Sequence, residues 1–103
     1  MQALLGHVVS EYGTAHVLVN NAAVYLDEDL PILQLPIKTL QETLETNTVS
    51  ALRLCQAFLP LMMQQNYGRV VNVSSASGQI EEMHDDGAAY HISKLALNGM
   101  TLI

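Results

Sequence analysis

Tyr90 and Lys94 are the residues of this 103-residue chain whose types and spacing best suit proton transfer. In an α-helix, positions i and i+4 lie on one face, so the phenol and the ammonium can point into the same space. A short apolar run precedes them and ends in Ser74 and Ser75, and a serine hydroxyl can hold a carbonyl oxygen. Because free tyrosine titrates at about 10, it needs an adjacent cation to exchange protons near neutrality. These residues predict an acid–base site that acts on a bound oxygen.

The spacing of Tyr90 and Lys94, taken alone, also fits an ordinary pair on a helix surface. The chain has four tyrosines and two lysines, and no other tyrosine is followed by a lysine at this distance. The serine pair at the end of the preceding strand adds a third group with a chemical use. The combination favours the functional interpretation over the surface pair.

Composition limits the class of protein. Half of the chain is hydrophobic and 14% is charged, as in one small globular domain. A net charge of -6 argues against nucleic-acid binding, which needs clustered basic residues. No apolar run reaches the length of a membrane span, and the N-terminus lacks the basic start of a signal peptide. The single Cys55 excludes an internal disulfide and is expected to pack in an apolar helix. We expect a cytoplasmic protein with no membrane, nucleic-acid or metal partner.

The first half of the chain predicts a helix followed by a strand. Apolar residues recur at helical spacing from Met1 to Tyr12, and Gly13 is expected to end this helix. Residues 16–20 form a short, continuous apolar run, which predicts a strand buried on both faces. A loop follows, and its acidic patch, residues 27–29, is expected to be solvated and without a catalytic role.

The second half predicts a helix, a strand and a last helix. Helical spacing after Pro36 places three apolar residues inward: Ile37, Leu40 and Leu44. Asn47 interrupts this helix before a long apolar one over residues 48–65. Residues 69–73 form the second predicted strand, and a helix begins at Ala88. This order implies parallel strands joined by a helical crossover, and we expect both ends of the chain to fall within helices.

Four motifs occur in order along the chain: Asn20-Asn21-Ala22, Asn47, Asn72-Val73-Ser74-Ser75 and Tyr90-x-x-x-Lys94. Together they resemble the short-chain dehydrogenase/reductase family, over essentially all 103 residues. The resemblance implies an α/β fold that is part of a Rossmann-type, doubly wound parallel sheet, with its fourth and fifth strands and their flanking helices. Residues 1–103 would then be an incomplete NAD(P)-binding Rossmann-type domain, truncated at both ends.

The resemblance also implies roles for single residues. Tyr90 resembles the acid/base that exchanges a proton with the carbonyl or alcohol oxygen. Lys94 resembles the lysine that lowers the pKa of the family's tyrosine and binds the nicotinamide ribose. Ser75 resembles the serine that orients the substrate oxygen, a position for which Ser74 aligns one step early. Asn47 resembles the asparagine whose helix break holds a water that links the lysine to solvent.

The expected cofactor is NAD or NADP, which the chain does not distinguish. Its contacts are expected from Asn20, Ala22 and Ala23, together with Tyr90 and Lys94. The expected activity is carbonyl–alcohol interconversion of a small molecule by hydride transfer, in a full-length homo-oligomer. An alternative is a non-catalytic remnant that acts as an interaction module. A related epimerase or dehydratase fits the first motif less well.

Two departures from the family pattern affect the cofactor site. Ala23 stands where the family usually has glycine, which would crowd the backbone if this position needs a positive φ. The six glycines never form a Gly-rich turn between a strand and a helix, so no pyrophosphate-binding turn is present. We therefore expect the isolated 103-residue chain to be inactive. Residues 79–89 are expected to line the substrate side, with Met83 as a pocket residue and His84 more exposed.

Overall fold

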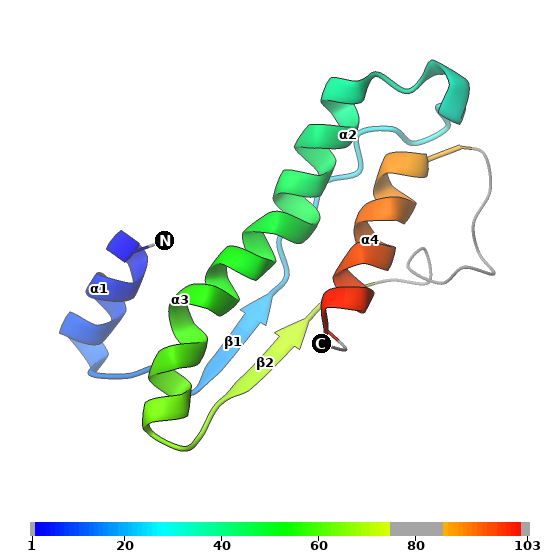
Figure 1. The fold of residues 1–103 in the computed structure, drawn as a ribbon. Coiled ribbons are helices and arrows are strands. Elements are labelled where there is room, and N and C mark those ends of the chain that lie inside the picture. Colours follow the sequence, from blue (N-terminus) through cyan, green and yellow to red (C-terminus); the bar gives the residue numbers. More distant parts are fainter. Residues whose placement is uncertain (1, 75–85, 102–103) are drawn as a thin grey trace.

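The computed structural model describes residues 2–74 and 86–101, which form helices and a two-stranded sheet (Figure 1). The helices and strands are α1 (Gln2–Tyr12), β1 (Val17–Asn20), η1 (Ile32–Gln34), α2 (Ile37–Leu44), η2 (Glu45–Val49), α3 (Ser50–Gln64), β2 (Arg69–Asn72) and α4 (Ala88–Thr101). The strands are parallel, and their register pairs Val17 with Arg69 and Asn20 with Asn72. The predicted order of elements and the α/β class are confirmed.

One continuous helical rod connects the two strands (Figure 1). It consists of α2, the π-helical turn η2 and α3, and it packs against α4 through α2 and η2. The buried side chains of α3 form much of the core: Ala51, Cys55, Ala57, Phe58 and Met62. Burial of Cys55 agrees with its predicted packing role.

The ends of α1 and α3 follow from local backbone chemistry. Gly13 has a φ of +80°, and its N–H donates to the Val9 carbonyl oxygen at 2.8 Å, so it ends α1 as predicted. Asn66 has a φ of +56° after α3. Beside it, Gln65 Nε2 donates to the Ala15 carbonyl oxygen at 2.8 Å and to that of Tyr67 at 3.0 Å. The Gln65 amide thus joins the segments that enter β1 and β2.

The strands are buried on one face only, so the prediction of burial on both faces is wrong. Val17, Val19 and Val71 are 55%, 54% and 48% exposed, while their neighbours Leu18 and Val70 are half-buried. The alternation arises because successive strand residues point to opposite faces, and α3 packs on the β1 strand. The described residues leave the other face of the sheet uncovered.

Two smaller predictions differ from the structure. Each strand is one residue shorter than expected, although the ladder continues: Arg69 N donates to the His16 carbonyl oxygen and Val73 N to that of Asn20, both at 2.9 Å. Ile37 was expected to face inward but is 67% exposed, because it is the first residue of α2. Helical periodicity identifies the packed face, but it does not show how far along the helix a neighbour extends.

Candidate active site

Tyr90 and Lys94 lie in the first two turns of α4, beside the carboxyl end of β2. Lys94 is only 3% exposed, and its Nζ lies 5.8 Å from the centroid of the Tyr90 ring. The same Nζ donates to the Val73 carbonyl oxygen at 3.1 Å. The structure therefore brings the phenol and the ammonium together at the sheet edge where the spacing placed them.

Burial of the Lys94 ammonium requires polar partners, because an uncompensated buried charge is strongly unfavourable. An ammonium has three N–H donors. Within residues 2–74 and 86–101, the Val73 carbonyl oxygen accepts one of them. The others can serve an oxygen-rich ligand at this edge, such as a ribose with two hydroxyls.

Asn47 is the central residue of the π-helical turn η2 and is 2% exposed. Its Oδ1 accepts from Val24 N at 2.8 Å, and its Nδ2 donates to the Val24 carbonyl oxygen at 2.9 Å and to Ser93 Oγ at 3.0 Å. Ser93 Oγ in turn donates to the Tyr90 carbonyl oxygen at 2.7 Å. The helix does not break at Asn47 as the sequence predicted, because it continues through a π-helical turn. The Asn47 side chain joins the loop after β1 to α4, one residue before Lys94. π-turns of this kind often occur at functional sites.

Asn20 lies at the carboxyl end of β1 and is 8% exposed. Its Nδ2 donates to Asn72 Oδ1 at 2.7 Å, whereas its buried Oδ1 has no hydrogen-bond partner among the described residues. A small cavity of about 90 Å³ opens beside it, lined also by Ala22 and Asn47. The free oxygen and the cavity give this end of β1 the capacity to bind a polar group.

Ala22 and Ala23 follow Asn20 and are exposed. Among the described residues other than glycine, positive φ angles occur only at Asp29 and Asn66. The backbone at Ala23 therefore does not need the glycine that the family usually has there, and the crowding considered from the sequence does not arise.

Ser75 lies outside the described residues, as do Met83 and His84, so their predicted roles are untested. Its neighbour Ser74 is described, and its Oγ is buried without a hydrogen-bond partner among residues 2–74 and 86–101. Of the serine pair expected to bind the substrate oxygen, the structure therefore describes only Ser74.

The expectation that residues 27–29 are solvated is wrong for Asp27, which is 1% exposed. Its Oδ2 accepts from Ala89 N at 2.7 Å, and its Oδ1 accepts from Tyr90 N at 3.3 Å. A run of acidic residues usually indicates a solvated face, and this pattern led to the wrong prediction for Asp27. Gly87 was the available signal that a distant side chain caps the last helix, because a glycine in front of a helix has no side chain to cap it.

Tyr25 is a second neighbour of Tyr90 that sequence reasoning missed. The two rings stack with their centroids 4.1 Å apart and their planes 5° from parallel. Partial burial raises the pKa of the Tyr25 phenol, and the carboxylates of Glu28, Asp27, Asp86 and Asp29 raise it further. The Tyr25 phenol that stacks on Tyr90 therefore ionises at a higher pH than a free tyrosine.

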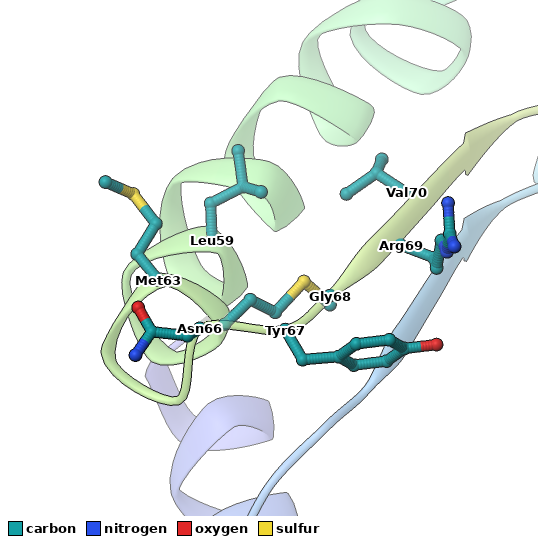
Figure 2. A pocket seen from close by; sticks show the side chains of 8 residues that line it. Leu59, Met63, Asn66, Tyr67, Gly68, Arg69 and Val70 are labelled. Carbon is teal, nitrogen blue, oxygen red and sulfur yellow. The ribbon is translucent and has the colours of Figure 1, made fainter.

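Other features of the described chain lie away from this edge. An open pocket of about 560 Å³ occupies the amino end of β2, opposite to Lys94, and is lined by α3 and the turn that follows it (Figure 2). Figure 2 shows Leu59 and Met63 of α3 on one side and Tyr67 and Arg69 on the other. Within residues 2–74 and 86–101, no cluster of side chains could hold a metal ion. None of the helices described there is long and apolar enough to cross a bilayer.

Comparison with known proteins gives a consistent result. The family model for short chain dehydrogenase matches residues 1–102. The chain is 40% identical over 73 residues to estradiol 17-beta-dehydrogenase 11 of Pongo abelii, covering 71% of this chain and 24% of that protein. It is 33% identical over 102 residues to the 3-oxoacyl-[acyl-carrier-protein] reductase FabG of Vibrio cholerae, covering 98% of this chain and 40% of the reductase.

Solved structures agree with these relatives. A short-chain dehydrogenase from Streptomyces avermitilis superposes with a TM-score of 0.89 at 30% identity, over 98% of this chain and 36% of that one. A metagenomic short-chain oxidoreductase in complex with NADP gives a TM-score of 0.85 at 31% identity, over 98% of this chain and 44% of the oxidoreductase. The 103 residues thus span between 24% and 44% of these proteins' lengths. With a family model that matches nearly every residue and an edge of the sheet that brings Tyr90 and Lys94 together, the chain belongs to the short-chain dehydrogenase family.

Proposed function

We propose that the protein at its natural length is an NAD(P)-dependent oxidoreductase that interconverts a carbonyl and an alcohol. The observation that carries this proposal is the buried Lys94 ammonium, 5.8 Å from the centroid of the Tyr90 ring at the carboxyl end of β2. Membership in the short-chain dehydrogenase family supports the same reaction class. The 103 residues would supply the catalytic part of an NAD(P)-binding Rossmann-type domain.

In this proposal, each residue has a definite task. Tyr90 Oη gives a proton to the carbonyl oxygen during reduction and takes it back during oxidation, as a general acid/base. Lys94 supplies the positive charge beside the phenol and binds ribose hydroxyls through its remaining donors. Ser75 orients the substrate oxygen. Asn47 orients α4 through Ser93 and, as the family resemblance implies, holds a water on the path from Lys94 to solvent.

The residues present fit a nicotinamide cofactor at this edge. Lys94 has donors that the described residues leave free, and Asn20 Oδ1 is a buried acceptor without a partner among them. Asn20, Ala22 and Ala23 would form the floor of the nicotinamide end. When bound, the cofactor supplies or accepts the hydride. Contacts to its pyrophosphate would come from residues outside this chain, since the chain has no Gly-rich turn.

The experiment is a comparison of Tyr90→Phe with wild type at natural length, with Tyr12→Phe as the matched control. Tyr12 lies on α1 and is 77% exposed, so its change should leave turnover intact. Estradiol and a 3-oxoacyl thioester, offered with NAD⁺, NADP⁺ or their reduced forms, are suitable probes beside a panel of simple secondary alcohols and ketones. Tyr90→Phe should lower kcat on the order of a hundred- to ten-thousand-fold, because it removes only the transferable proton. Cofactor affinity should change little.

Two results would contradict this function. One is wild-type turnover in the Tyr90→Phe variant, and the other is a wild-type protein that turns over none of the probes with either cofactor. The second result would favour the alternative, a non-catalytic interaction module. A specific observation favours that alternative, namely the exposed sheet face formed by Val17, Val19 and Val71.

A cytoplasmic location and a homo-oligomeric assembly complete the proposal. The location is supported by the single Cys55, which is buried and forms no disulfide among the described residues. The assembly is supported by apolar side chains of α3 that remain exposed: Leu52, Leu59 and Met63. Sedimentation of the natural-length protein tests the assembly, and a monomer at micromolar concentration would contradict it.

A further inference from the structure

The first turn of α4 cannot be capped by the residue that precedes it. The His91 N–H donates to the Gly87 carbonyl oxygen at 3.0 Å, so Gly87 occupies the N-cap position. Its φ is +66°, and a Cβ there would lie 2.6 Å from Tyr25 Oη. Glycine is therefore favoured at this position, and because it has no side-chain oxygen, the free N–H groups of the first turn need an acceptor from elsewhere.

Asp27 supplies that acceptor from 62 residues earlier in the chain. Its two carboxylate oxygens accept the N–H groups of Ala89 and Tyr90, the second and third residues of α4. These are the amides that an N-cap side chain normally satisfies, and a carboxylate there also interacts favourably with the helix dipole. Within residues 2–74 and 86–101, no ion pair involves Asp27, so the amides of α4 compensate its buried charge.

The segment that carries Asp27 contacts the start of α4 at three further points. The Gly87 N–H donates to the Leu30 carbonyl oxygen at 3.2 Å, and Pro31 forms an antiparallel bridge with Asp86. The Tyr25 ring stacks on Tyr90. The backbone and the ring of Tyr90 are thus both held by the loop that follows β1, in addition to the helix that contains Tyr90.

We infer that Asp27 is the positioning residue for Tyr90: as a remote N-cap, it fixes the turn of α4 from which the phenol reaches the substrate oxygen. The inference rests on the proposed function for its catalytic consequence, and on the two Asp27 hydrogen bonds for its structural part. A displacement of about 1 Å at a reacting group can lower turnover about a hundredfold. Loss of this cap should therefore lower kcat and leave cofactor binding largely intact.

The test compares Asp27→Asn with Glu28→Gln in the natural-length protein. Both changes remove one carboxylate charge and keep the side-chain shape, but Glu28 is exposed. Amide hydrogen exchange is followed at Ala89 and Tyr90, with the Leu97 amide of the same helix as an internal reference. NMR of ¹³C-labelled tyrosine reports the environment of the Tyr90 ring, and estradiol with NAD⁺ is the probe for turnover.

Asp27→Asn should raise exchange at Ala89 and Tyr90 about tenfold, because charged acceptors form the stronger hydrogen bonds. Exchange at Leu97 should stay unchanged. The Tyr90 ring signals should shift, and kcat should fall at least tenfold with the KM for NAD⁺ within about twofold. Glu28→Gln should match wild type in every measurement. If Asp27→Asn does not fold, Asp27→Ser, which keeps a short oxygen acceptor, replaces it.

Unchanged exchange at Ala89 and Tyr90 would overturn the inference. Faster exchange with unshifted Tyr90 ring signals and wild-type kcat would overturn it also, since the cap would then be structural only. If the ring signals shift but wild type turns over none of the probes of the proposed function with either cofactor, the placement of Tyr90 by Asp27 is supported and the proposed function fails. If wild type is active and Asp27→Asn is equally active, the proposed function stands and the inference fails.

Discussion

Replacing Asn47 by alanine should destabilise the protein more than any other single change of a described amide side chain. Asn47 is 2% exposed and takes part in hydrogen bonds with both backbone groups of Val24 and with Ser93 Oγ. Ser93 keeps a partner in the variant, because it already donates to the Tyr90 carbonyl oxygen. The Val24 N–H and carbonyl groups do not, and each partly buried group left without a partner costs about 1–3 kcal/mol. For the two Val24 groups together, the expected loss is about 2–6 kcal/mol in the free energy of unfolding.

The assay is urea unfolding of the natural-length protein, followed by far-UV circular dichroism and analysed as a two-state transition. Gln41→Ala is the matched control, because Gln41 is an exposed amide on the same helical rod. It should change the unfolding free energy by less than about 0.5 kcal/mol.

Asn47→Asp separates the two hydrogen bonds of the Asn47 clamp, by which we mean the pair that its Oδ1 and Nδ2 form with the backbone N–H and carbonyl groups of Val24. The carboxylate keeps the acceptor for Val24 N but faces the Val24 carbonyl oxygen without a proton to donate. It should therefore be less stable than wild type at neutral pH. An unfolding free energy of Asn47→Ala within about 0.5 kcal/mol of wild type would refute the reasoning, because the clamp would then contribute nothing measurable.

Two further predictions concern the start of α4. Gly87→Ala should lower the free energy of unfolding by about 1–2 kcal/mol, because a left-handed φ of +66° is unfavourable for alanine and the new Cβ would lie 2.6 Å from Tyr25 Oη. The control is Gly6→Ala, on α1 with open space around it, which should raise the free energy of unfolding by about 0.5–1 kcal/mol in the same urea assay. Equal effects of the two changes would show that the conformation of Gly87 is unimportant. The raised pKa of Tyr25 means that unfolded chains lose this phenolic proton first as pH rises. The contribution of neutral Tyr25 to the stability of the fold is therefore fully present below about pH 10, and it is lost as the pH rises through the folded-state pKa of Tyr25. Tyr25→Phe should flatten that alkaline decline in urea midpoints, and identical pH profiles for the two proteins would contradict the assignment.

The parts of the fold that could be predicted from sequence are those governed by local pattern. Gly13 ends α1 because an αL residue was needed after a helical stripe. The irregularity predicted at Asn47 is present, but as a π-helical turn within a continuous helix and not as an interruption. The parallel pairing of β1 and β2 followed from the alternation of strands and helices. The apolar pattern of the strand could not predict that Val17 and Val19 are exposed, because their exposure depends on which elements cover the sheet.

The candidate site was predictable only in its local part. The offset from Tyr90 to Lys94 is a property of one helix, and it was read directly from spacing. The partners that hold this helix come from 62 residues away for Asp27 and 46 for Asn47, and no periodic pattern connects such distant positions. Asp27 was assigned to solvent because its neighbours in the sequence are acidic, whereas its neighbours in space are the amides of α4.

At its first turn, α4 is held by the loop after β1 rather than by the described residues of the sheet. Between the described parts of α4 and β2, the Lys94 ammonium reaches the Val73 carbonyl oxygen, and Asn72 Nδ2 donates to Thr101 Oγ1 at the far end of the helix. At the catalytic end, by contrast, Asp27 holds the Tyr90 amide, Tyr25 covers its ring, and Asn47 links Val24 to Ser93. The orientation of the Tyr90 ring at this end of α4 is therefore set in part by Asp27 and Tyr25, which contribute no atom to the proposed chemistry.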